Sequence, residues 1–182
     1  MKWLTPEQEQ QIRQKAAATY LREICGFVLE NGEVVEVINR SDNPVEKFEI
    51  SPADYAIYEP RGIKGVWHTH LELDAFSPTD QMVMASDTLP WAVYCLRTNR
   101  FHQCDPTATA PLLGRPFCFG VYDCYSLVSD KLAELGVTLP EWPRGDYGEW
   151  NTPAFSPFDT QANNVGRRVT DGIYAEGDIL LM

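Results

Sequence analysis

Two histidines separated by a single residue are the feature that most restricts how this chain can fold. His68 and His70 directly follow the apolar pair Val66 and Trp67, and this pattern predicts a short buried strand over residues 66–70. Side chains alternate along a strand, so both imidazoles are expected on the same face of it. There they could bind one metal ion together.

A helix start lies a few residues after the histidines. Ser77 is a favourable N-cap and Pro78 suits the first helical position, so a helix is predicted from Ser77 to about Thr88. Asp80, in its first turn, could add an oxygen ligand. Two nitrogens and one carboxylate, with a fourth position open, are typical of a catalytic zinc site. The alternative interpretation is that the histidines form only the polar end of a strand.

The combined pattern of His-x-His, a spacer and Ser-x-x-Asp resembles the signature of the JAMM (JAB1/MPN) metalloproteases. That family also has a glutamate on an earlier strand, and Glu23, before an apolar run, is similar to it. The resemblance implies that His68, His70 and Asp80 hold Zn²⁺ with water as the fourth ligand. It also implies that Glu23 is the base and that Ser77 helps to hold the oxyanion.

The spacer between His70 and Ser77 contains six residues, whereas the family usually has seven. A deletion in the loop could leave the ligands in place, because loops absorb length changes at low cost. The site could instead have lost its metal. Zinc-dependent hydrolysis of a peptide or isopeptide bond is therefore one hypothesis, and a metal-free JAMM-like module is the other.

The local patterns predict an α/β (α+β) fold for residues 1–103, and the resemblance implies a JAMM/MPN-like sheet with flanking helices. The 182 residues are 44% hydrophobic, enough for buried cores in one large or two small domains. The JAMM resemblance covers about residues 6–105. The predicted elements are a helix over 5–22, a hairpin of 25–30 and 33–39, a strand over 47–50, a helix over 51–58, the strand 66–70, the helix 77–88 and a strand over 90–96.

Residues 104–116 contain three prolines and no strong period, so they are predicted to be a linker. From Asp123 to Gly136 apolar residues recur at helical spacing, which places Cys124 in the first turn of a helix. Free amide groups and the helix dipole favour a nucleophilic thiolate there. The alternative interpretation is a small buried apolar residue.

The segment Gly-Val-Tyr-Asp-Cys-Tyr-Ser-Leu-Val around Cys124 resembles the nucleophile segment of NlpC-type cysteine peptidases, papain-like enzymes that cut peptides of bacterial cell walls. The resemblance implies a small α+β domain over residues 117–182, with Cys124 as the nucleophile. Tyr122 matches a position that helps to bind substrate or stabilise the oxyanion.

A cysteine peptidase also needs a histidine to accept the thiol proton. In the NlpC-type family this histidine follows a Gly-Asp segment like Gly177-Asp178. Residues 177–182 look like a strand cut in mid-element. We therefore expect residues 117–182 to be the N-terminal part of such a domain, with its histidine beyond Met182.

The order of the two resemblances is similar to that in the tail tip assembly proteins of long-tailed bacteriophages. This implies other phage tail tip proteins as partners, peptidoglycan peptides as a further partner class, and a location in the host cytoplasm during assembly or at the virion tail tip. The net charge of −11 argues against binding to nucleic acid, and no apolar run is long enough for membrane insertion. A non-catalytic tail-tip component or assembly scaffold is the structural alternative.

Overall fold

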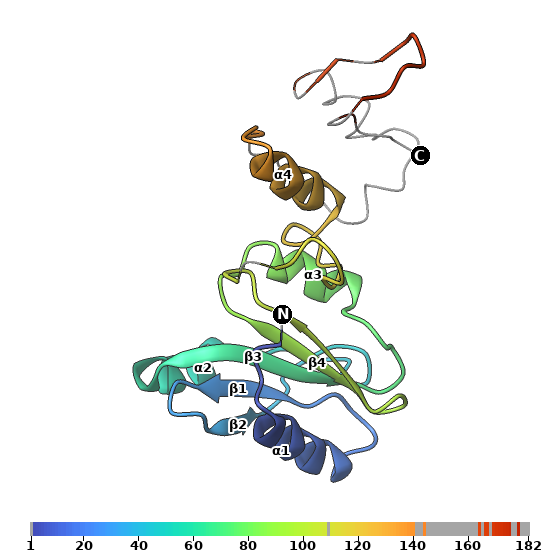
Figure 1. The fold of residues 1–182 in the computed structure, drawn as a ribbon. Coiled ribbons are helices and arrows are strands. Elements are labelled where there is room, and N and C mark those ends of the chain that lie inside the picture. Colours follow the sequence, from blue (N-terminus) through green and yellow to red (C-terminus); the bar gives the residue numbers. More distant parts are fainter. Residues whose placement is uncertain are drawn as a thin grey trace. The chain divides into compact units, whose positions relative to one another are not determined.

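A computed structural model describes residues 2–108, 110–140, 144, 164, 166–167, 169–175 and 178. The chain divides into two compact units, Met1–Ala110 and Pro111–Met182 (Figure 1). Within the ranges just given, no helix is both long and apolar enough to cross a membrane.

The first unit is built on a five-stranded sheet in the order β2-β1-β3-β4-β5. Strands β3 and β4 run parallel, and the other neighbouring pairs are antiparallel, so the sheet is mixed. The predicted α+β class is confirmed. The strands are β1 (Cys25–Leu29), β2 (Val34–Val37), β3 (Ile63–His70), β4 (Trp91–Cys95) and β5 (Arg100–Cys104).

One helix of the first unit precedes β1 in the sequence, and the others lie between strands. In chain order, the helices are α1 (Pro6–Ala17), α2 (Pro52–Tyr58), the 3₁₀ helix η1 (Glu59–Arg61) and α3 (Pro78–Met84). The α3 helix is part of the crossover that makes β3 and β4 parallel.

Alternation along the strands gives the sheet two different faces. Trp67 of β3 and Ala92 of β4 belong to one buried cluster with Ile12 of α1, which covers that face. On the opposite face Phe27 of β1 packs against Tyr55 of α2, with ring centroids 4.8 Å apart. Because His68 and His70 alternate with Trp67, they belong to this second face.

Several predicted elements differ from the observed ones. Helix α1 has the expected capping box at Thr5, but it ends at Ala17 instead of residue 22. Tyr20 and Leu21 beyond it are 70% and 84% exposed, so they do not extend its apolar face. Residues 47–50 form no strand, and α3 ends at Met84 instead of residue 88. Strand β5 was not predicted, because its sequence is largely polar and lacks a regular apolar alternation.

The second unit contains the helix α4 (Cys124–Glu134). Asp123 is its N-cap and accepts a hydrogen bond from the backbone N–H of Ser126 at 2.9 Å. The same carboxylate accepts from the backbone N–H of Gly120 and from Nε of Arg144, at 3.1 and 2.7 Å. The predicted helix and the place of Cys124 in its first turn are confirmed. The strand predicted for residues 177–182 lies outside the described residues, apart from position 178.

Candidate metal centre

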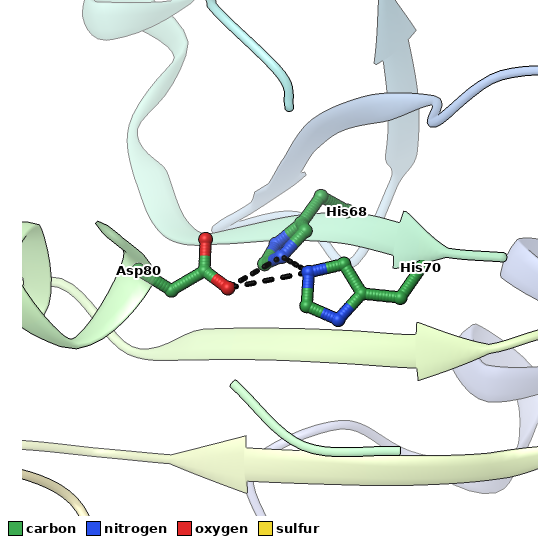
Figure 2. Close-up of side chains that lie close together, drawn as sticks. All are labelled: His68, His70 and Asp80. Carbon is green, nitrogen blue, oxygen red and sulfur yellow. Dashed lines mark hydrogen bonds and ion pairs between the residues drawn. The ribbon is translucent and has the colours of Figure 1, made fainter. Parts of the chain in front are cut away.

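Strand β3 and helix α3 bring three ligating side chains together. His68 and His70 project from the end of β3, and Asp80 projects toward them from the first turn of α3 (Figure 2). Their ligand atoms all lie within 4.8 Å of one another. Within the part of the chain that the structure describes, this is the one group of three or more such residues that could hold a metal ion.

The distances within this cluster fit a tetrahedral metal ion. Nε2 of His68 lies 3.1 Å from Nε2 of His70, and Oδ2 of Asp80 lies 3.3 Å from each of these nitrogens. Bonds of about 2.0–2.1 Å in tetrahedral geometry place ligand atoms about 3.3 Å apart. The three ligands therefore fit zinc without a large rearrangement, and they leave a fourth position open.

The protonation states of the three side chains affect how well the cluster can hold a cation. Burial lowers the pKa of His68, which keeps this imidazole neutral. Burial would raise the pKa of Asp80, but its electrostatic interactions and hydrogen bonds with His68 and His70 outweigh it and lower that pKa. Burial would lower the pKa of His70, but hydrogen bonding to Asp80 and the nearby carboxylate charges raise it. A proton on His70 therefore competes with a metal.

The six-residue spacer helps to orient His70. Nδ1 of His70 lies 3.3 Å from the carbonyl oxygen of Leu73 in the spacer, which suits a ring whose Nε2 is left free for a metal. The spacer is fastened to β5 by Asp74, whose carboxylate lies 2.6 Å from Nε2 of His102. The shorter spacer thus leaves the ligand atoms converged.

Ser77 and Asp80 hold each other in a capping box at the start of α3. Oγ of Ser77 accepts from the backbone N–H of Asp80 at 3.1 Å, and the backbone N–H of Ser77 donates to Oδ2 of Asp80 at 2.7 Å. This Oδ2 is the oxygen that faces both imidazoles. The capping box therefore also fixes the orientation of the acidic ligand.

Glu23 lies beside the cluster because of the strand register. Cys25 of β1 pairs with His68 in the antiparallel β1–β3 ladder, so two residues further along Glu23 comes next to His70. Its Oε1 lies 3.8 Å from Nε2 of His70, and the side chain is buried. Burial raises the pKa of Glu23 to about 7. The charge of His70 opposes this shift, and the charges of Asp80 and Glu46 add to it.

The cluster opens into a cavity of about 400 Å³ in which acidic residues outnumber basic ones. This excess of negative charge favours a cation. Phe48 is one of the residues that line the cavity, and its ring stacks on the imidazole of His68, with ring centroids 4.3 Å apart. The lining residues are Glu23, Ser41, Asp42, Glu46, Lys47, Phe48, Glu49, Ile50, Tyr55, His70, Ser77, Thr79, Asp80, Val83, Asp87 and Trp91.

Sequence analysis missed the wall formed by residues 41–50. The alternation of residues 47–50 suggested a strand, and no short motif marks this segment as part of a cavity. The aromatic Phe48 among charged residues was the one available signal.

The second candidate site is less complete. Cys124 is the first residue of α4 and carries an exposed free thiol, whereas Tyr122 is buried. Residues 111–182 contain no histidine.

Comparison with known proteins agrees with the geometry of the first unit. Residues 5–105 match the family of prokaryotic homologs of the JAB domain. This match, the mixed sheet and the His-His-Asp cluster define a protein with a JAB-like domain.

Tail tip assembly protein K of Escherichia phage N15 is 32% identical to this chain over an alignment of 174 residues, which covers 92% of the chain and 71% of the relative. Tail tip assembly protein K of Escherichia phage lambda is 33% identical over 99 residues, 53% of this chain and 48% of the relative. The chain therefore belongs to the prokaryotic JAB-domain family and, within it, to the tail tip assembly proteins of phages.

Proposed function

We propose that the first unit is a zinc-dependent peptidase that hydrolyses a peptide or isopeptide bond during assembly of a phage tail tip. The convergence of His68, His70 and Asp80, with ligand atoms 3.1–3.3 Å apart, carries the proposal. Zinc held there would polarise the scissile carbonyl and lower the pKa of a bound water.

Three groups beside the metal cluster have roles in this reaction. Glu23 takes a proton from the attacking water, and its pKa of about 7 suits a general base near neutral pH. Ser77 lines the cavity, and because its Oγ already accepts from the backbone of Asp80, its hydroxyl hydrogen is left to donate to the carbonyl oxygen of the substrate. The carbonyl oxygen of Leu73 keeps the His70 ring in place.

The names of the relatives give the setting. Both are tail tip assembly proteins, so we take other tail tip proteins of the same phage as partners and as the first substrates to test. The protein would act in the host cytoplasm during assembly and stay with the tail tip of the virion.

The test compares wild-type protein with Glu23→Gln, which keeps all three proposed ligands. Both proteins are loaded with zinc and incubated with the tail tip proteins of the phage, and new chain ends are mapped by mass spectrometry. We expect both proteins to hold about one zinc ion each and only the wild type to cleave, because loss of a general base costs about 10²–10⁴-fold in rate. Equal cleavage by both, or absence of bound zinc, would refute the proposal.

The relatives are named for assembly and not for catalysis, and this favours a structural role as the second candidate. In that case the first unit is a metal-free binding module or scaffold. Phage carrying Glu23→Gln would then assemble infectious tails as efficiently as the wild type.

For the second unit we propose an NlpC-type cysteine peptidase, of which residues 117–182 supply the nucleophile segment. When the domain also includes a histidine that accepts the thiol proton, Cys124 would attack a peptide bond of peptidoglycan, and Tyr122 would help to position the substrate. The exposed thiol at the first position of α4 supports this role. Wild-type tails should release peptides from purified peptidoglycan and Cys124→Ala tails should not; equal release would exclude Cys124 as the nucleophile.

A further inference from the structure

One asparagine side chain links the backbone of Glu23 to the wall of the cavity. Nδ2 of Asn39 donates to the carbonyl oxygens of Glu23 and Lys47, at 2.9 and 3.0 Å. Its Oδ1 accepts from the backbone N–H groups of Ser41 and Glu49, at 3.0 and 3.1 Å. The amide therefore uses both of its donor hydrogens and both acceptor positions.

The segment that Asn39 closes depends on these contacts for its shape. Residues 40–49, all of which the structure describes, contain turns but neither a helix nor a strand. The backbone N–H of Arg40 donates to the carbonyl oxygen of Glu49 at 2.9 Å, which closes the segment into a loop. The N–H of Glu23 donates to the carbonyl oxygen of Pro44 at 2.6 Å. Loop 40–49 thus holds the backbone N–H of Glu23, and Asn39 holds its backbone C=O.

The same loop faces the metal cluster. Phe48 stacks on His68, and Ser41, Asp42 and Glu46 line the cavity together with Glu23. A displacement of the loop would therefore move the ring that covers one ligand, the cavity wall and the backbone of the proposed base at the same time.

We propose that Asn39 is a positioning residue of the metal site: its amide fixes the backbone of Glu23 and closes loop 40–49 over the cavity. Its effect on turnover rests on the peptidase function proposed above. Aspartate cannot replace it, because a carboxylate retains the acceptors for Ser41 and Glu49 but places negative charge against the carbonyl oxygen of Glu23.

Hydrogen exchange of the full chain tests the positioning role directly. Asn39→Ala should speed exchange of the amides in loop 40–49 by about tenfold or more, because four hydrogen bonds of the local structure are lost. Asn43→Ala is the matched control, since Asn43 lies in the same loop but its Nδ2 reaches only the exposed Glu46 carboxylate, at 2.9 Å. Unchanged exchange in Asn39→Ala, or an equal rise throughout β3 and β4, would overturn the proposal.

The Glu23 carboxylate provides a second, spectroscopic reading. Its ¹³C resonance, assigned by its loss in Glu23→Gln, should shift more in Asn39→Ala and Asn39→Asp than in Asn43→Ala, which alters only the nearby Glu46 carboxylate. An unmoved resonance in both Asn39 variants would also overturn the proposal.

Turnover separates this inference from the proposed function. With an active wild type, Asn39→Ala should keep its zinc and its KM within about threefold while kcat falls about 10–100-fold, because a misplaced catalytic group costs rate more than binding. A wild type that does not hydrolyse would refute the peptidase, whereas the role of Asn39 would still be decided by exchange and by the Glu23 resonance.

Discussion

Replacing Asp80 by asparagine should remove most of the stability that zinc gives to the first unit. Asparagine has the shape of aspartate, and it can still accept the capping hydrogen bond from the backbone of Ser77. It lacks the charge of the oxygen that lies 3.3 Å from both imidazoles. The substitution therefore weakens the metal site and leaves the helix start largely intact.

The size of the effect follows from linkage. Zinc at 100 times its Kd stabilises the folded state by about 2.7 kcal/mol, and for a unit of about 100 residues this raises Tm by about 10 °C. A variant that binds zinc about 100-fold more weakly gains only about 0.4 kcal/mol at the same zinc concentration, or about 2 °C. The assay is scanning calorimetry of the full chain, with free zinc set by a buffering chelator.

Glu49→Gln is the matched control, because Glu49 is an exposed carboxylate of the same cavity wall and not one of the clustered ligands. It removes one negative charge from the cavity as Asp80→Asn does, and its zinc shift should stay within about 2 °C of the wild type. Equal zinc shifts in all three proteins, or no shift in the wild type, would show that His68, His70 and Asp80 do not form the metal site.

Three further predictions concern pH and packing. The raised pKa of His70 means that its proton competes with zinc, so zinc affinity, measured against a chromophoric chelator, should fall about tenfold per pH unit below that pKa; a constant affinity would contradict this. Gly26→Ala should lower the stability of the first unit by about 3 kcal/mol in thermal unfolding, because the added Cβ would lie 1.9 Å from the carbonyl oxygen of Val35. Gly166→Ala, in the second unit, adds a Cβ that meets nothing within 4 Å and should change stability little; an undiminished stability of the first unit in Gly26→Ala would refute the packing explanation. Burial would raise the pKa of Asp123, but its paired arginine and backbone donors lower it, so its stabilisation is present at neutral pH and is lost as pH falls below about 4. Asp123→Ala should accordingly destabilise α4 by about 1–2 kcal/mol at pH 7 and speed its hydrogen exchange, and this difference from the wild type should shrink as pH falls below about 4.

The sequence by itself determined the features that depend on near neighbours in the chain. The alternation that puts His68 and His70 on one face, and the N-cap that places Asp80 in the first turn of α3, are local geometry. The helix that begins at Cys124 follows from the same kind of pattern. Periodicity and capping act over a few residues, so they can be read without knowledge of the fold.

Only the tertiary structure decided whether these parts meet. The β1–β3 register brings Glu23 to His70, and the spacer carbonyl of Leu73 orients that ring despite the missing residue. Loop 40–49, mistaken in part for a strand, takes its shape from the side chain of Asn39. Such contacts join residues that are distant along the chain or follow no period. Their energy comes from hydrogen bonds and packing that form only once the sheet has assembled, so local sequence patterns do not reveal them.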